Sequence, residues 1–360
     1  MHCLQLAAND TFWNSPLRTR SRSRKRNQGL RTVKAVCQNA LTCLFVSFAL
    51  ITATLPAHAF KAFVSNEKDN TISVIDTKSM KVIHTIKVGQ RPRGIMLAKD
   101  DTWLLICTSD DNRIEVYDAK TYEFIKNLPS GPDPELFALH PSGNPLYIAN
   151  EDDNIVTVVN IDTGRIIAEV PVGVEPEGMG VSPDGRYVVN TSETTNMAHF
   201  IDTKTNETVA NILVDNRPRV AQFTSDGKQL WVSAEIGGTV TIIDADKKVP
   251  IHKISFEIPG INADAIQPVG IRINKAGTKA FVALGPANRI AVIDAKTFKV
   301  EKYILVGQRV WNLAFTPDEK LILTTNGTSN DVTVVDVKKQ RAFKSITVGR
   351  YPWGIVIANH

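Results

Sequence analysis

The stretch Val88-Gly-Gln-Arg-Pro-Arg-Gly-Ile95 recurs along the chain with its glycines and proline kept and its other residues changed. It returns as VGVEPEGM at 172–179 and as VGRYPWGI at 348–355. Glycine tolerates a positive φ and proline fixes φ, so this pair sets one reproducible turn. A turn that returns at a regular period indicates a repeated structural unit.

Two further markers repeat with this turn. One is a polar turn, such as HPSG at 140–143 or SPDG at 182–185. The other is an apolar pair that ends in aspartate, and we expect that side chain to cap the turn that follows it. The successive spacings of these aspartates are 42, 44, 40, 42, 50 and 42 residues, within the range of about 40–50 typical of propeller blades. The aspartates are Asp76, Asp118, Asp162, Asp202, Asp244, Asp294 and Asp336.

Each repeat holds four short apolar runs that are rich in Val, Ile and Thr and separated by turn residues. In one repeat, the runs cover 93–98, 103–108, 113–118 and 123–128. No window shows a sustained helical period. Four antiparallel strands, which we call a to d from first to last, repeated radially predict an all-β fold, a β-propeller.

The chain ends predict how the ring closes. The first repeat begins with strand b at 61–65 and lacks strand a, whereas the chain stops after a strand a at 353–358. Pairing the C-terminal strand with the N-terminal blade completes that blade and hides an edge that would invite aggregation. The sequence therefore predicts seven four-stranded antiparallel blades.

The first 59 residues read as a secretory signal with an extended basic n-region. An apolar run at 41–55 and the sequence Pro56-Ala57-His58-Ala59 follow that region. The run is shorter than the roughly 20 residues that span a bilayer, so we expect cleavage after Ala59 and a periplasmic location. An uncleaved N-terminal anchor is the alternative. The expected domains are a signal peptide at 1–59 and one propeller domain at 60–360; the basic residues are Arg18, Arg20, Arg22, Arg24, Lys25, Arg26, Arg31 and Lys34.

Charge and cysteine content restrict the function classes. The leader holds 8 of the 42 Lys and Arg and 1 of the 37 Asp and Glu, which leaves 34 basic and 36 acidic residues, a net charge near −2. Nothing in that balance argues for nucleic-acid binding. Cys107 is the one cysteine outside the leader and lies in an apolar run, so we expect a buried structural thiol rather than a disulfide.

The repeats resemble those of secreted bacterial seven-bladed propellers built from YVTN repeats. The tetrapeptide appears as Tyr187-Val-Val-Asn190, Tyr147-Ile-Ala-Asn150 and Phe63-Val-Ser-Asn66. More narrowly, the chain resembles the PQQ-dependent catabolism-associated β-propeller proteins. That resemblance implies a periplasmic accessory to alcohol oxidation whose partners belong to a quinoprotein dehydrogenase system. It implies no PQQ bound to this chain.

The residues that flank the turn proline are the candidate binding site, because they begin the inner strands near one mouth of the channel. They vary by sector: two neighbouring blades are acidic, the blades beside them carry arginine, and the two closing blades are aromatic. We expect Trp311 and Trp353 to be exposed there and to bind a protein partner or small ligand with the arginines. The candidates are Arg91, Arg93, Glu135, Glu177, Arg217, Arg219, Arg309, Trp311, Tyr351 and Trp353.

Two features bear on this site. A longer connection around 256–266 lies on the same face and supports a binding role. Weak surface ion pairs at exposed turn positions are the alternative interpretation. The loops between strands b and c are acidic, and we expect their carboxylates to be solvated turn residues without Ca²⁺. They include Glu67, Asp69, Asp110, Asp111, Glu151, Asp152 and Asp153.

Signatures of catalysis are absent from the sequence. There is no C-x-x-C-H, H-E-x-x-H or G-x-S-x-G motif, and the histidines occupy non-equivalent repeat positions. We therefore expect a binding protein with no catalytic residue, metal or cofactor. Two alternatives stay open: a lactonase-like hydrolase with a channel metal held by carboxylates such as Glu135 and Glu177, and binding of single-stranded nucleic acid.

Overall fold

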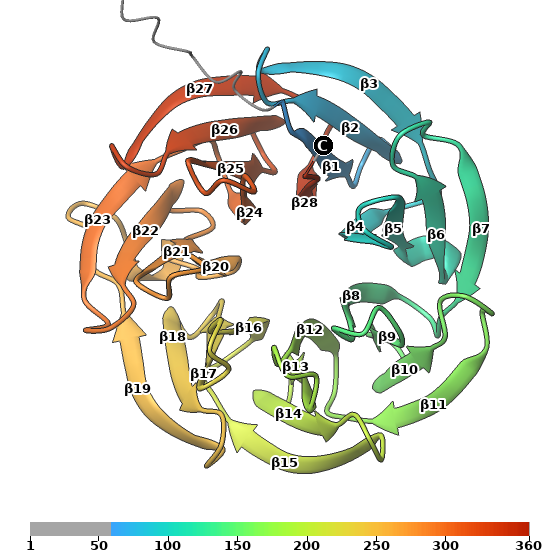
Figure 1. Ribbon diagram of the computed structural model, residues 1–360. Coiled ribbons are helices and arrows are strands. Elements are labelled where there is room, and N and C mark those ends of the chain that lie inside the picture. The colour runs from blue at the N-terminus through green and yellow to red at the C-terminus, as the bar shows by residue number, and fades with distance from the viewer. Residues whose placement is uncertain (1–58, 360) are drawn as a thin grey trace, which may run out of the picture. The chain divides into compact units, whose positions relative to one another are not determined.

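The computed structural model describes residues 59–359, so the predicted signal peptide lies, apart from Ala59, outside the described residues. Seven four-stranded antiparallel sheets stand around a central axis, which confirms the predicted β-propeller (Figure 1). Between residues 59 and 359, no helix has the length and apolar character needed to cross a membrane. Helical structure in this range consists of two single-turn 3-10 helices, Ser109–Asp111 and Ala263–Ala265.

The blades follow one another in chain order, each running from an inner to an outer strand. The first three blades comprise β28 (Pro352–Ile357), β1 (Lys61–Asn66), β2 (Thr71–Asp76) and β3 (Lys81–Lys87); β4 (Pro92–Ala98), β5 (Trp103–Thr108), β6 (Arg113–Asp118) and β7 (Phe124–Pro129); and β8 (Pro134–Leu139), β9 (Leu146–Asn150), β10 (Ile155–Val159) and β11 (Ile166–Pro171). The next two comprise β12 (Pro176–Val181), β13 (Tyr187–Ser192), β14 (Met197–Asp202) and β15 (Glu207–Leu213); and β16 (Pro218–Phe223), β17 (Gln229–Ala234), β18 (Thr239–Asp244) and β19 (Val249–Ser255). The last two comprise β20 (Ile271–Ile273), β21 (Lys279–Ala283), β22 (Arg289–Asp294) and β23 (Val300–Leu305); and β24 (Val310–Phe315), β25 (Leu321–Asn326), β26 (Asp331–Asp336) and β27 (Arg341–Thr347).

The ring closes as the sequence predicts. β28 pairs antiparallel with β1, with Ala62 opposite Ile357 and Val64 opposite Ile355. The last strand of the chain is thus the inner strand of the first blade. The pairing covers the inner edge of β1, as the innermost strand covers the second strand in the other six blades.

Apolar side chains of neighbouring blades form the core. Phe63 and Ile72 of the first blade, for example, lie in one cluster with Leu104 and Ile106 of the second. Cys107 is fully buried, and burial raises the pKa of its thiol well above the usual value, which confirms the structural role predicted for it. The inner strands approach closely: a Cβ on Gly354 would lie 2.5 Å from the carbonyl oxygen of Arg93, so the glycine permits this packing.

The cap predicted after the third strand is present, but one repeat shifts its position. Asp118 Oδ1 accepts hydrogen bonds from the backbone N–H groups of Lys120 and Thr121. In the third blade, Asn160 Oδ1 accepts the corresponding bonds from Asp162 and Thr163, so the prediction for Asp162 was wrong. With Asn160 as the marker, every spacing is 42 residues except the one that holds the longer connection. The amide oxygen of asparagine can cap a turn as a carboxylate oxygen does. A search for aspartate alone therefore selected Asp162 instead of Asn160 as the marker of this repeat.

In six of the seven turns from outer to inner strand, a residue other than glycine adopts the left-handed conformation. Its N–H donates to the side-chain oxygen of an asparagine 21 residues earlier, which is left-handed too. This pair fixes six of the seven turns against the preceding loop. The left-handed residues have φ between 49° and 58° and are Arg91, Asp133, Glu175, Arg217, Arg309 and Tyr351. Their asparagines are Asn70, Asn112, Asn154, Asn196, Asn288 and Asn330.

The longer connection between β19 and β20 is anchored rather than free. Phe256, Ile258 and Ile266 are buried in the same apolar cluster as Trp231 and Ile271. Residues 259, 260 and 262–264 remain exposed. The connection is therefore anchored in the core of the fifth and sixth blades near its two ends, and its middle is largely exposed.

Candidate functional site

Arg93 and Glu135 form the first part of a charged site where the inner strands begin. Six of these seven strands shift their register near their start, as β4 does between Pro92 and Ile95. Arg93 pairs with Glu135, and its guanidinium lies 3.9 Å from carboxylate oxygens of Glu67 and Glu177. The predicted candidates of three neighbouring blades are therefore in contact.

Arg219 extends the site through the fourth and fifth blades. Its guanidinium contacts Glu177 at 2.9 Å, pairs with Glu193 and lies 3.6 Å from Glu235. Arg219 is 3% exposed, so its positive charge depends on these carboxylates. Burial disfavours its charge, but the three glutamates more than offset this and raise its pKa.

The arginines before the turn proline form an outer layer. Arg91 contacts Asp110 at 2.9 Å and Glu135 at 3.1 Å, and it also pairs with Asp133. Arg217 lies 2.9 Å from Glu193. Arg309 spans the sixth blade to reach Glu235 at 3.1 Å.

We call this set the mouth cluster. It contains five arginines, joined by ion pairs to seven carboxylates, and Glu151, whose carboxylate lies within 4.8 Å of those of Asp133 and Glu135. Carboxylates thus outnumber guanidinium groups by three. The members are Arg91, Arg93, Arg217, Arg219, Arg309, Glu67, Asp110, Asp133, Glu135, Glu151, Glu177, Glu193 and Glu235.

The sequence prediction missed part of this cluster. Glu193 and Glu235 were not candidates, and Glu67 and Glu151 were expected to be solvated turn residues. All four are the first residue after the second strand of their blade. A comparison of the residues at that position in all seven repeats would therefore have identified them. Asp69 is a turn residue as expected, with Arg350 as its partner at 2.5 Å.

The expectation of two exposed tryptophans was wrong. Trp353 is 1% exposed, and Trp311 is half-buried. Their indoles lie beside the cluster, with the guanidinium carbon of Arg93 5.5 Å from the ring of Trp353 and that of Arg309 4.4 Å from the ring of Trp311. Gly327 leaves room for Trp311, since a Cβ there would collide with the indole. The exposed aromatic residue of this face is Tyr351, at 39%.

Several buried polar atoms of the site have no hydrogen-bond partner within the described chain. They are the indole nitrogens of Trp311 and Trp353, the Nε atoms of Arg91, Arg93 and Arg219, and both carboxylate oxygens of Glu177. Glu177 is 1% exposed, and one of its oxygens nevertheless forms an ion pair of 2.9 Å with Arg219. Buried polar groups in proteins are nearly always hydrogen-bonded. Most of the unsatisfied buried side-chain atoms of the described residues therefore lie at this one site.

Burial favours the neutral, protonated form of several carboxyl groups of the mouth cluster. Burial raises the pKa of Glu135 and of Glu151, and neighbouring Glu177 raises both further. Burial also raises the pKa of Glu193 to about 7, although Arg219 opposes the shift. A bound cationic group would offset this cost and hold these carboxyl groups ionised.

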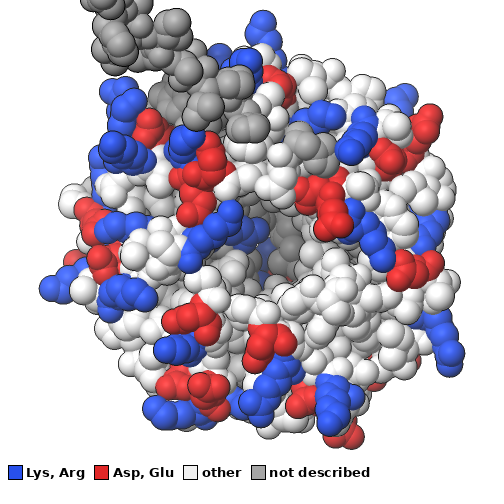
Figure 2. Space-filling model, viewed as in Figure 1, with Lys and Arg blue, Asp and Glu red and all other residues white. Residues whose placement is uncertain are grey.

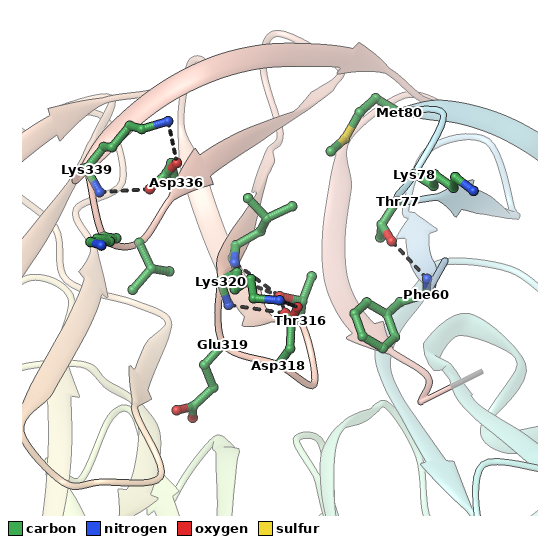
Figure 3. Close-up of a pocket in the computed structure, with 13 residues that line it drawn as sticks. Phe60, Thr77, Lys78, Met80, Thr316, Asp318, Glu319, Lys320, Asp336 and Lys339 are labelled. Carbon is green, nitrogen blue, oxygen red and sulfur yellow. Dashed lines mark hydrogen bonds and ion pairs between the residues drawn. The ribbon is translucent and has the colours of Figure 1, made fainter. Parts of the chain in front are cut away.

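A separate groove lies elsewhere, among the turns of the first and seventh blades (Figure 3). Its volume is about 710 Å³, and no residue of the mouth cluster lines it. Its charges are paired locally, Lys339 with Asp336 at 3.2 Å and Lys320 with Asp318 at 2.9 Å. It has no counterpart to the unsatisfied atoms of the mouth among the described residues.

Comparison with known proteins supports the fold. Hydrazine synthase from Kuenenia stuttgartiensis matches 76% of this chain and 92% of its own, at 20% identity and a TM-score of 0.70. A functionally unknown protein from Desulfotomaculum acetoxidans matches 84% and 99%, at 13% identity and a TM-score of 0.70. Dihydro-heme d1 dehydrogenase NirN, in complex with DHE, matches 85% and 78%, at 14% identity and a TM-score of 0.63.

Sequence comparison adds one domain match. No curated protein matches the chain. Residues 153–320, less than half of the chain, match the Choice-of-anchor I domain. The chain is thus a seven-bladed β-propeller with a segment similar to the Choice-of-anchor I domain.

Proposed function

We propose that this chain is a non-catalytic binding protein whose mouth cluster receives a cationic surface of a protein partner. The excess of carboxylates over guanidinium groups in the mouth cluster carries this proposal. A lysine or arginine side chain from a partner supplies the missing positive charge. The same excess disfavours the phosphate backbone of a nucleic acid.

The exposed rim around the cluster provides the contact surface. Arg217, Arg309 and Tyr351 are 45%, 33% and 39% exposed, and they flank the buried carboxylates. Tyrosine and arginine are enriched at the energetic centres of protein interfaces. The rim therefore orients the partner, and the buried carboxylates bind its charge.

The partner is a component of a PQQ-dependent dehydrogenase system in the periplasm. The resemblance to YVTN propellers and to the PQQ-dependent catabolism-associated subgroup supports this part of the proposal, as does the predicted secretory leader. The match to a domain named for anchoring is in keeping with a location outside the cytoplasm.

Co-purification from the periplasm of alcohol-grown cells tests the proposal. Wild type is expected to retain a PQQ-dependent dehydrogenase or its cytochrome and to release it as salt rises, because the contact is electrostatic. Tyr351→Ala is expected to lose it, because the rim loses its exposed aromatic side chain. Arg341→Ala, on exposed outer strand β27, is the matched control. Equal recovery with all variants contradicts the assignment of this face.

A metal-dependent hydrolase is the second candidate, because the carboxylates of Asp133, Glu135 and Glu151 converge within 4.8 Å. Arg91 and Arg93 already pair with two of them, so a cation must displace these guanidinium groups. This competition favours the binding role. Metal analysis decides: bound metal, with a Ca²⁺-dependent rise in Tm that Glu151→Gln abolishes and Asp153→Asn keeps, supports the hydrolase.

A further inference from the structure

A second feature of the molecule, independent of the mouth cluster, is a cavity of about 290 Å³ in the central channel. The inner strands β4, β8, β12, β16, β20, β24 and β28 surround the axis, and the face in Figure 2 is hollowed at its centre. The cavity lies further along these strands than the mouth cluster. Its walls include the apolar side chains of Met96, Leu136, Phe137, Met179, Val220 and Ile355, together with Gln222, Arg272 and Asn312.

Arg272 is the one charged side chain that lines this cavity. It is partly buried on β20, and a guanidinium nitrogen donates one hydrogen bond of 2.8 Å, to the carbonyl oxygen of Ile271. Burial alone lowers its pKa, and no carboxylate of the described residues pairs with it. Arginine nevertheless stays protonated in proteins, so the channel holds a positive charge without a counter-ion.

This arrangement differs from that of the mouth, where every arginine has a carboxylate partner. An unpaired charge in an apolar cavity is costly unless an anion offsets it. Gln222 occupies the equivalent position on the neighbouring inner strand β16, and its amide nitrogen donates 2.9 Å to the carbonyl oxygen of Phe223. Arg272 is therefore the group in the cavity wall that can neutralise an anion.

Size and wall chemistry restrict the anion. The volume is at the lower end of the range of about 300–1,000 Å³ typical of ligand pockets, so the ligand is small. A carboxylate matches the planar fork of the guanidinium, and an alkyl chain matches walls such as Met96 and Met179. We propose that the channel binds a small aliphatic monocarboxylate, with its carboxylate on Arg272 and its chain against the apolar wall.

Calorimetric titration of the purified protein with sodium butyrate and sodium hexanoate tests this site. Both are expected to bind wild type and to raise its Tm. Arg272→Gln is expected to bind them roughly 10- to 100-fold more weakly, because charge-assisted hydrogen bonds are lost. Arg289→Gln is the matched control: Arg289 lies in the same blade, outside the cavity, and should leave the affinity unchanged.

Two further arms keep the test decisive. 1-Butanol has the chain without the charge and sulfate has charge without the chain, so either one binding as well as butyrate overturns the proposal. No binding of the carboxylates to wild type, or equal binding to Arg272→Gln, overturns it too. Should the Gln variant fail to fold, Arg272→Met, which replaces the charge with an apolar side chain, serves in its place. None of these outcomes depends on a partner at the mouth cluster.

Discussion

Trp353 was predicted to bind a partner, but its burial indicates that it contributes to the stability of the fold. It follows the turn proline, the position that holds arginine or glutamate in four other blades, and packs beside Arg93 with 1% of its surface exposed. Asn312 donates a hydrogen bond of 3.1 Å to its carbonyl oxygen. The sequence showed its position in the ring, but its burial depends on neighbouring blades that one repeat does not reveal.

Trp353→Ala is expected to destabilise the protein by about 3–5 kcal/mol, because it opens a cavity beside a buried charge. Denaturant unfolding measures the change. Tyr351→Ala, two residues away and exposed, should change stability by less than about 0.5 kcal/mol. Equal losses for the two variants would show that Trp353 is not packed as described.

Glu193 makes the stability depend on pH. Its pKa of about 7 in the folded protein lies above the ordinary 4.5, so the folded state holds this proton more tightly than the unfolded state. The stabilisation from its neutral form is complete below about pH 4.5 and is lost as pH rises to about 7. Glu193→Gln removes this titration. The free energy of unfolding of the variant should therefore rise relative to that of wild type as the pH increases from about 5 to about 8.

The comparison needs a matched carboxylate. Glu207 is exposed in the same blade, so Glu207→Gln should keep a constant difference from wild type across the same range. A Glu193→Gln difference that is constant, or that falls with rising pH, contradicts the raised pKa.

At the scale of elements, one asparagine holds each of six outer-to-inner turns. Asn154 has φ of 58°, its side-chain oxygen accepts from the N–H of Glu175 at 3.1 Å, and its carbonyl oxygen accepts from Val172 at 3.0 Å. The sequence predicted the turn from its glycine and proline but not this partner. The asparagine lies 21 residues earlier, in another loop, and only the closed blade brings the two together.

Asn154→Ala and Asn154→Gly separate the two contributions of this residue. Both lose the side-chain hydrogen bond, at a cost of about 1 kcal/mol, but only alanine also carries the strain of a positive φ. Alanine should therefore be less stable than glycine by about 1 kcal/mol in denaturant unfolding. A glycine variant as unstable as the alanine variant would show that φ carries no cost here.

At the scale of the whole molecule, the repeat made the ring predictable. The boundaries of β5 and β6 agree with the expected ranges, and the closure of β28 on β1 was also predicted. The site was only partly predictable, because its geometry joins residues of different blades. The sixth blade carries Gln267 and Val269 at the positions where other blades carry charges, and Arg309 reaches across it to Glu235. No spacing along the chain predicts that contact.

Seven rigid blades hold these charges in place without help from a ligand. The inner strands fix the backbone on which the mouth cluster stands, and the ion pairs then link six of the blades. Carboxylates in excess, held in a buried ring, cannot rearrange to satisfy one another. The central claim is that this mouth, and not the outer wall, meets the partner.

Photo-crosslinking tests that claim most directly. Benzoylphenylalanine is placed either at position 351, on the mouth rim, or at position 343, on outer strand β27 where Phe343 is 50% exposed. We predict that irradiation in alcohol-grown cells yields an adduct from position 351, with a protein of the PQQ-dependent dehydrogenase system, and none from position 343. Adducts from position 343 alone, or from neither position, would contradict the account.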